Sequence, residues 1–447
     1  MPLLGNKLFY LGILIFNLFY ISYAENLQVM NLTNKNDSNF KMLNNNFANS
    51  KLLKKIEDYA KKHNIQFGIP EGDRFFTYGI STFDISKDYE RRKVFAFEKA
   101  YLDALKKMAQ TIYTRVESKI IQEIKESAPS FEDLQPSNSE ILKKKILALT
   151  DASLNKALEK LGVSPEKIGN LNLEKKRNLL LDSYRKKVIS ETLANLGGTL
   201  VLKTFEEIGK DGNCAVGVIV YNSGKLKNLA DYFARGDIPP YRNLSKAKPI
   251  EKYLPKTPKE WLATWGVQVV WDNKGYPALI SYAQWGYPLV GSPRRLRMKD
   301  KLARKKADLL ARSYIAQFLN MNILSKEIAY FEQKLQTDRI IGSGMIREID
   351  IDKIAETLYE EAKATSKANI KGLTTLKVER YCYKIKDYQA CSYFVVKILS
   401  PQNMIKVDNY LRARENPRRE MENVKQKNNF YKEEHLEGIS NTDVSDW

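Results

Sequence analysis

Histidine, the side chain most often used to move protons near neutral pH, occurs twice in these 447 residues, as His63 and His435. A Ser-His-Asp or Cys-His arrangement must bring its partners within hydrogen-bond reach of one another. His63 precedes the two folded stretches described below, and His435 lies in a charged C-terminal segment. We therefore expect no histidine-based catalysis, and three cysteines at these spacings predict no metal site.

Paired carboxylates are the other groups with acid–base potential, for instance in glycoside hydrolysis across about 5 to 9 Å. Glu206 and Glu207 are neighbours on an expected strand, so their side chains should point to opposite faces of the sheet. The cluster of Glu348, Asp350 and Asp352 is expected at the start of a helix, where negative charge is favoured. Glu360 and Glu361 are expected at adjacent positions of a helix. The chain also has no P-loop and no G-x-G-x-x-G motif. We expect no catalytic residues, no cofactor and no enzymatic activity, with a carboxylate-based glycan hydrolase as a distant alternative.

Residues 1–24 have the pattern of a secretory signal peptide. Lys7 supplies the positive charge, residues 8–21 are mostly apolar, and small residues at Ser22 and Ala24 suit cleavage after Ala24. The apolar stretch is short for a bilayer, which needs about 20 apolar residues. We therefore expect a periplasmic or otherwise exported protein with no transmembrane anchor after signal cleavage; the alternative is a retained anchor.

Two stretches of the chain repeat each other at a fixed spacing. A glycine followed by regularly spaced alanines recurs 207 residues later; the residues are Gly79, Ala96, Ala100, Ala104 and Ala109, then Gly286, Ala303, Ala307, Ala311 and Ala316. The strand-like run 214–223 recurs 177 residues later as 391–400. The sequence thus predicts an α+β fold with two tandem repeats of strand, long Ala-rich helix, helical insert, β-hairpin and short helix.

Composition divides the chain into six segments. They are a signal peptide at 1–24, a flexible leader with a short helix at 25–73, the first α+β unit at 74–235, a Pro/Lys-rich linker at 236–260, the second α+β unit at 261–413, and a disordered charged tail at 414–447. In the leader, residues 25–50 are expected to be flexible and 52–63 helical.

Each unit has a predicted order of elements. The first has a strand at 75–83, helices at 89–124, 139–161 and 173–196, a hairpin of 198–208 and 214–221, and a helix at 226–233. The second has an added strand at 265–271, a strand at 276–287, a helix at 294–319, helical filler at 323–367, a hairpin at 373–399 and a helix at 402–413.

The cysteines can be interpreted from the second hairpin. If it turns at residues 386–387, Cys382 and Cys391 form a non-hydrogen-bonded pair whose side chains are close together. That geometry predicts a Cys382–Cys391 disulfide in an oxidising compartment, with two reduced thiols as the alternative. At a spacing of 177 residues the position matching Cys382 is Phe205, so Cys214 is expected to be a buried, unpaired thiol.

Aromatic residues crowd the start of the second unit. Four tryptophans there are candidate interaction residues, because such side chains are enriched at binding hot spots; they are Trp261, Trp265, Trp271 and Trp285. The alternative is that most of them form the core between a hairpin and the Ala-rich helix.

The formal net charge of +20 restricts the expected partners. A basic exported protein meets anionic lipid, lipopolysaccharide, acidic glycans and acidic proteins, whereas its compartment normally lacks nucleic acid. The basic residues are also spread along the chain, which is typical of solvated helix faces. We expect no nucleic-acid partner.

The glycine strand, the helix with A-x-x-x-A-x-x-x-A and the late hairpin with its short helix resemble the N-terminal domain of flagellar assembly protein T and related small surface-lipoprotein modules. The matching residues are Gly79, Ala96, Ala100 and Ala104, then Gly286, Ala303, Ala307 and Ala311. The resemblance implies an exported, non-enzymatic α+β module used in envelope or appendage assembly. This chain departs from it by two copies, long helical inserts and no lipid anchor.

These observations together predict a structural or assembly protein of the bacterial envelope. It would dock to other envelope proteins, in a large multi-protein assembly such as a secretion, flagellar or pilus machine. The alternative is a cationic periplasmic module that binds an anionic envelope polymer, peptidoglycan or lipopolysaccharide.

Overall fold

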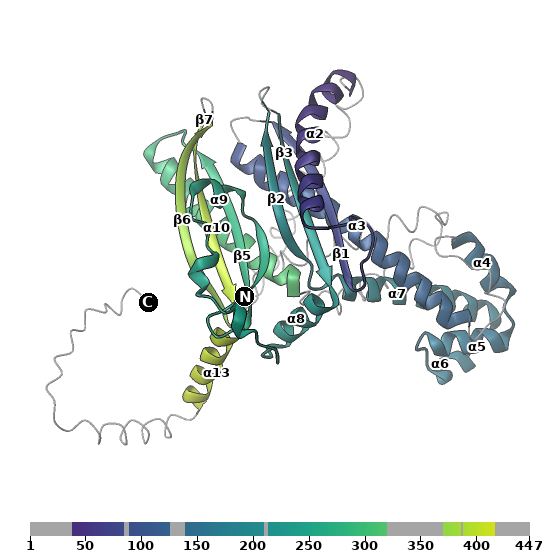
Figure 1. Cartoon of the computed structure of the whole chain (residues 1–447). Helices are drawn as coiled ribbons and strands as arrows, with labels where there is room; N and C mark the ends of the chain where they lie inside the picture. The colour runs from purple at the N-terminus through teal and green to yellow at the C-terminus, as the bar shows by residue number, and fades with distance from the viewer. Residues whose placement is uncertain are drawn as a thin grey trace, which may run out of the picture.

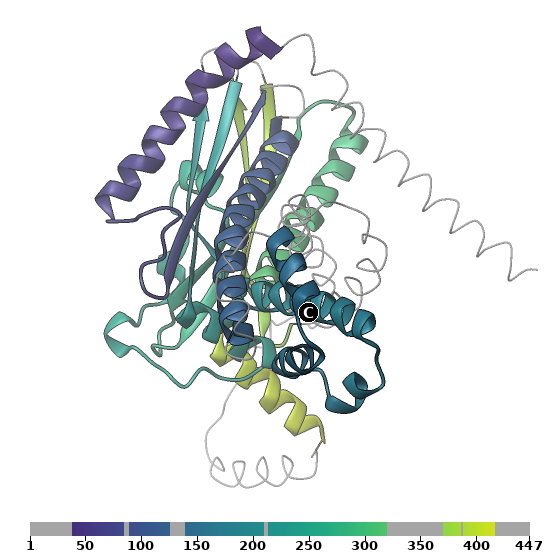
Figure 2. The same ribbon diagram turned by 90° about the vertical axis from the view of Figure 1, so that its right-hand side faces the viewer.

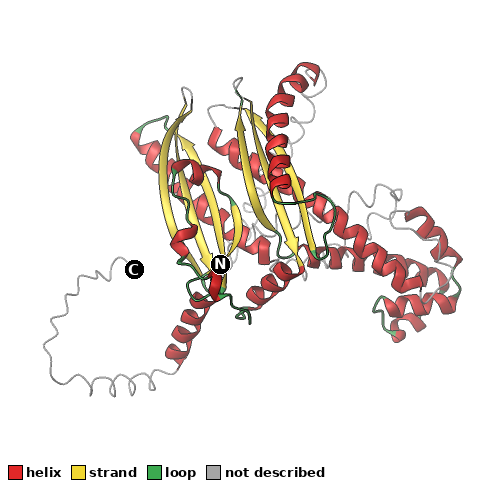
Figure 3. Cartoon of the chain, viewed as in Figure 1, coloured by secondary structure: helices red, strands yellow, loops and turns green. Residues whose placement is uncertain are grey.

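The computed structural model describes residues 38–84, 89–125, 139–209, 213–319, 370–385 and 388–415. They form an α+β fold in which two antiparallel sheets stand side by side with helices on their faces (Figures 1 and 3). We call residues 74–235 the first unit and residues 261–413 the second unit. None of the helices within these ranges is both long and apolar enough to cross a membrane.

The first sheet has the strand order β1–β3–β2, with both pairings antiparallel. Its strands are β1 (Arg74–Asp84), β2 (Leu200–Ile208) and β3 (Asn213–Ser223). The helices of this unit are α3 (Tyr89–Lys125), α4 (Ser139–Ala148), α5 (Asp151–Lys160), α6 (Pro165–Gly169), α7 (Leu173–Leu196) and α8 (Gly224–Arg235). The turn expected at residues 210–212 lies outside the described residues.

Small residues allow α3 to lie directly on the first sheet. Ala100 and Ala104 have no exposed surface, and a Cβ built on Gly79 would lie 2.0 Å from the Ala100 carbonyl oxygen. The Thr77 hydroxyl, also on β1, donates to the Ala104 carbonyl at 2.8 Å. Close packing of helix and strand is therefore the reason for both the glycine and the alanines.

The helix α2 (Ser38–Lys62) covers the opposite face of the first sheet (Figure 2). Leu52 and Ile56 are fully buried against Ala215 and Ile219 of β3. The expectation of a flexible segment over residues 25–50 is therefore wrong for residues 38–50, which are helical. Phe40, Leu43 and Phe47 are spaced as on one helical face, a signal hidden among the asparagines.

The second sheet has the strand order β4–β5–β7–β6, again entirely antiparallel. Its strands are β4 (Gly266–Trp271), β5 (Pro277–Pro288), β6 (Leu373–Ile385) and β7 (Tyr388–Leu399). The helices of this unit are α9 (Pro258–Ala263), α10 (Pro293–Leu319) and α13 (Pro401–Glu415). The helical filler predicted at 323–367, with its acidic clusters, lies outside the described residues, as does the chain after Glu415.

The two hairpins share local irregularities. β2 has a bulge between Val201 and Lys203, and β6 has one between Thr375 and Lys377. A glycine precedes each strand in the left-handed region, Gly198 at φ +78° and Gly372 at φ +79°. A Cβ on either glycine would collide with the first turn of the helix that follows the hairpin, α8 or α13.

Both helices that follow the hairpins start with the same cap. Ser223 Oγ accepts a hydrogen bond from the Leu226 amide, and Ser400 Oγ accepts one from the Asn403 amide, each at 3.3 Å. A serine at this position satisfies an amide that has no partner within the helix.

An ion pair joins the long helix to the edge strand in each unit, with its charges exchanged. In the first unit Lys93 of α3 lies 2.6 Å from Glu206 of β2. In the second unit Asp300 of α10 lies 3.1 Å from Arg380 of β6. The cation is on the helix in the first unit and on the strand in the second.

The hairpin register corrects two matches made on sequence spacing. The bulges place Cys382 at the position of Ile208, which faces Cys214, and not at the position of Phe205, which faces Gly217. Gly79 faces α3, whereas Gly286 faces Glu90 and Ser392 on the side of its sheet away from α10. Side chains alternate between the two faces of a sheet along each strand. An error of three residues in the spacing used to match the units therefore pairs residues that lie on different faces of their sheets.

One hydrophobic core extends through both units. The ring of Phe97 on α3 stacks on Trp265 with centroids 4.7 Å apart, and Gly266 on β4 lies directly against Val201 on β2. The Gly198 amide also donates to the Phe318 carbonyl of α10 at 2.8 Å. The residues between the units, predicted as a semi-rigid linker, include two short 3-10 helices, Leu244–Lys246 and Ile250–Tyr253, and Tyr253 bonds to β4 and β5.

Candidate ligand-binding groove

A groove of about 820 Å³ lies on the first unit where four segments meet. Its walls come from the chain before β1, the middle of α3, the end of α7 and the start of α8. Figure 1 shows these segments at the lower end of the first sheet. A recess of this size is in the range of small-ligand sites.

Buried polar contacts hold the α7 and α8 walls in place. The Asn222 side chain, 8% exposed, donates to the Gly197 carbonyl at 3.1 Å and to the Thr199 hydroxyl at 3.0 Å. Ser223 follows as the cap of α8. The end of β3 is thereby tied to the connection between α7 and β2, so the groove is a preformed feature of the fold.

Four basic side chains line the groove, and three have an acidic partner. Arg74 lies 3.0 Å from Glu71, Lys227 lies 3.2 Å from Asp231, and Lys119 has two carboxylates at 3.8 and 3.9 Å. Arg115, one helical turn before Lys119 on α3, is exposed and forms no ion pair with any residue that the structure describes. The groove therefore contains a cation available for a ligand.

The rest of the lining is apolar or acidic. Phe75 and Val116 are buried and Ile112 is half-buried, so they form an apolar surface beneath the charges. Asp73 and Glu191 add two carboxylates at the rim. These groups provide ionic and hydrophobic recognition side by side.

A second polar cluster is buried where the two units meet. Glu206 of β2 accepts from Lys93 at 2.6 Å and from the Tyr89 hydroxyl at 2.5 Å. Glu90, 2% exposed, accepts from the Ser392 hydroxyl of β7 at 2.8 Å. Lys93 also donates to the Leu262 carbonyl at 3.1 Å, so the start of α3 is bonded to both units.

Burial raises the pKa of the Glu90 carboxyl above its ordinary value. Lys93 and the hydroxyls of Tyr383 and Ser392 act in the opposite direction without reversing the change. One Glu90 oxygen, Oε1, is buried and has no hydrogen-bond partner among the described residues. A buried carboxyl with a raised pKa therefore joins the two units at this point.

Glu206 and Glu207 lie on opposite faces of the sheet. Glu206 bonds to α3, whereas Glu207 bonds to Lys55 of α2 at 2.5 Å. The two carboxyl groups therefore do not share a cleft.

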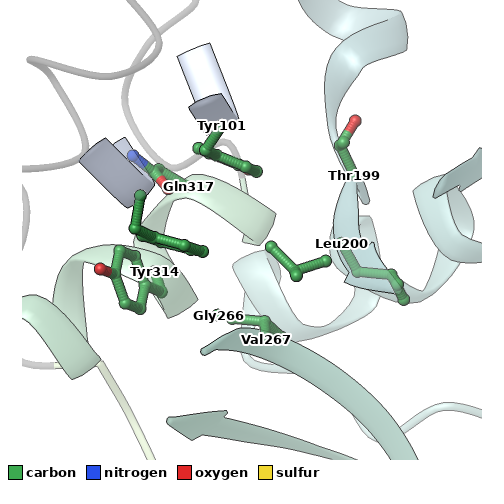
Figure 4. A pocket seen from close by; sticks show the side chains of 9 residues that line it. Tyr101, Thr199, Leu200, Gly266, Val267, Tyr314 and Gln317 are labelled. Atoms are coloured by element: carbon green, nitrogen blue, oxygen red, sulfur yellow. The ribbon is translucent and has the colours of Figure 1, made fainter. Parts of the chain in front are cut away.

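A small cavity of about 10 Å³ also lies between the units (Figure 4). Tyr101, Leu200 and Val267 are among its lining residues. The Tyr314 hydroxyl and the Gln317 amide nitrogen are buried nearby without hydrogen-bond partners in the described part of the chain. This volume holds one water molecule at most, so the cavity is not a ligand site.

The candidate tryptophans do not form a surface patch. Trp261 is 5% exposed and packs on Phe394, and Trp265 is 3% exposed in the shared core. Trp271 and Trp285 are half-buried, and Lys306 covers the Trp285 ring at 4.2 Å. Trp261 and Trp265 are thus unavailable as contacts, because Trp265 lies in the core shared by both units and Trp261 lies in a separate core on the second sheet.

The structure joins Cys382 and Cys391 in a disulfide, with Cα atoms 4.0 Å apart, and Cys214 is buried and not part of a disulfide. Sequence reasoning did not identify the groove, because its residues come from four separate segments spread over residues 70–227. The one available signal was the Gly/Pro turn before β1, which leads into the groove at Pro70 and Gly72.

Comparisons with known proteins name no activity. Residues 139–235, from α4 to α8, match a family model described as a domain of unknown function, DUF6844. No curated protein matches. A crystal structure of a hypothetical protein from Francisella tularensis is similar at 22% identity, with a TM-score of 0.48, over 79% of this chain and 91% of that one.

Proposed function

We propose that this chain is an exported, non-enzymatic structural or assembly protein of the bacterial envelope. It docks to other periplasmic components, in a secretion, flagellar or pilus machine. The groove on the first unit is the observation that carries this proposal, because it combines an unpaired cation with an apolar floor in a preformed recess.

We also infer that the two units are copies of one ancestral α+β unit. The strand orders β1–β3–β2 and β5–β7–β6 correspond, with β4 as an addition. The bulges, left-handed glycines, serine caps and helix-to-strand ion pairs recur at corresponding positions. Four independent local features are difficult to explain by two unrelated folds.

Export and docking are tested together with the tagged full chain expressed in its own cells. The expected result is a mature protein that begins after Ala24, is found in the envelope fraction, and co-purifies after mild cross-linking with a defined set of envelope proteins. A chain that keeps its N-terminal segment and remains in the cytoplasm would contradict export. An exported chain that purifies alone would contradict docking.

The alternative, an anionic-polymer binder, makes a separate prediction. It would sediment with purified peptidoglycan or lipopolysaccharide and be released by salt, because exposed charge contacts are screened over roughly 8 to 10 Å. Sedimentation that is insensitive to salt would speak against it.

A further inference from the structure

We infer that the groove of the first unit binds an acidic peptide segment of the partner protein, one in which carboxylates flank an apolar side chain. This inference rests on the proposed docking function and specifies its chemistry. The groove is defined by Arg74, Arg115, Lys119 and Lys227 around the apolar residues Phe75 and Val116.

Arg115 is the expected anchor of the ligand's carboxylate. Its guanidinium presents several N–H donors in a planar fork that fits a carboxylate with two parallel hydrogen bonds. The other three cations of the groove already have acidic neighbours, at 3.0 to 3.9 Å. Lys119 has the longest of these contacts, so it can turn to a second ligand carboxylate.

The apolar floor of the groove favours a ligand that carries an apolar group in addition to a negative charge. Phe75 is 5% exposed and Val116 is 6% exposed, at the base of a recess of about 820 Å³. Because these two side chains are already nearly buried, the gain comes from the ligand: a side chain such as leucine placed on this floor loses its own apolar contact with water, which favours binding. A peptide offers carboxylates and an apolar side chain at the short spacing that the groove presents.

The acidic residues of the groove disfavour a polymer dense in phosphate. Asp73 lies close to Gly224 at the start of α8, with its carboxylate oxygen 3.4 Å from the position of an added Cβ. Glu191 lies on the α7 wall near Lys119. A chain of closely spaced phosphates would place like charges beside both carboxylates, whereas a peptide can place amides there.

The test is binding of a labelled peptide in which glutamates alternate with leucines, followed by fluorescence anisotropy on the full chain. Arg115→Glu is expected to weaken binding at least about tenfold, because a charge-assisted contact is replaced by repulsion. Lys227→Glu, on the opposite wall, is expected to weaken it as well. Arg297→Glu is the matched control, since it makes the same charge change at an exposed site on α10 of the second unit and should leave affinity within about twofold.

Several results would overturn the inference. They are equal loss in the Arg115 and Arg297 variants, equal binding of a peptide with glutamine in place of glutamate, full competition by inorganic phosphate or lipopolysaccharide vesicles, or cross-links from the groove to residues 416–447 of the same chain. Melting curves for each variant show whether it is folded. If the Arg115 variant still co-purifies with the wild-type set of envelope proteins, the groove assignment fails while the docking proposal stands.

Discussion

Replacing Ile208 with cysteine should create a second disulfide, with Cys214. Ile208 faces Cys214 across the first hairpin, in the position that Cys382 has opposite Cys391 in the second. The neighbouring Gly209 amide bonds to the Asn213 carbonyl at 2.7 Å, so Ile208 and Cys214 form a non-hydrogen-bonded pair with close side chains. Phe205→Cys is the matched control, because it faces Gly217.

The size of the effect follows from the loop that the new bridge closes. That loop is slightly shorter than the native one, whose cysteines are 9 positions apart, and closing such a loop is worth about 2 kcal/mol. Ile208 is 44% exposed, so its loss removes little packing. In the Ile208→Cys variant, oxidation of both bridges should raise the free energy of unfolding relative to the reduced variant. This increase should exceed the increase that oxidation gives in the wild type by about 2 kcal/mol.

The assay is thiol titration with mass spectrometry of non-reduced peptides, followed by denaturant unfolding with and without reductant. Ile208→Cys should have no free thiol, and Phe205→Cys should have two. A bridge from position 205, or a free Cys214 in the Ile208 variant after oxidation, would refute the correspondence between the hairpins.

Three further variants test the packing and the buried cluster. Gly79→Ala places a Cβ against the α3 backbone and should cost about 3 kcal/mol in denaturant unfolding, whereas Gly169→Ala, which meets nothing within 4 Å, should be nearly neutral; equal effects would refute the close approach. Glu90→Gln removes a carboxyl whose pKa is raised by burial. In the wild type, ionisation of Glu90 lowers the free energy of unfolding as pH rises above the ordinary pKa of about 4.5. The loss is about 1.4 kcal/mol for each pH unit between the ordinary and the raised pKa. The variant should therefore gain stability relative to wild type between pH 4 and pH 8, and a pH-independent difference would contradict this. Lys93→Met leaves the Glu206 carboxylate without its counter-charge and should cost about 3 to 5 kcal/mol, which combination with Glu206→Gln should largely restore; a double variant as unstable as the single one would count against the ion pair.

Element types were predictable because the local patterns are strong. The Ala-rich helix was expected at 89–124 and runs from Tyr89 to Lys125, and the expected second hairpin has the pairing that joins Cys382 to Cys391. The periodicity of apolar and small residues is a local property of the sequence, so it can be recognised without knowledge of the tertiary structure.

The local similarities between the two units were less accessible to sequence reasoning. Side chains on a strand alternate between the two faces of its sheet. The spacing that matched Gly79 with Gly286 therefore paired a residue that faces the long helix with one on the face away from the long helix. The ion pairs were hidden because the charges are exchanged between the units, Lys93 with Glu206 in the first and Asp300 with Arg380 in the second, so a comparison of residue types finds no match. Only the contact between helix and strand shows that each unit has such an ion pair.

The groove and the buried tryptophans depend on tertiary packing. Arg115 is one of 73 basic residues, and nothing in its surroundings along the chain marks it as unpaired. Tryptophan is enriched at interfaces, but hydrophobic cores use the same bulk: Trp265 lies in the core shared by both units, and Trp261 lies in the core on the second sheet.

The most direct test of docking through the groove is photo-cross-linking in living cells from position 111 on its wall, with the tagged full chain carrying a photoreactive residue in place of Thr111. We expect a cross-linked product with one envelope protein, through an acidic segment of that protein, and its loss when Arg115→Glu is added but not when Arg297→Glu is added. Cross-links to this chain alone, or a product unaffected by Arg115→Glu, would contradict docking through the groove.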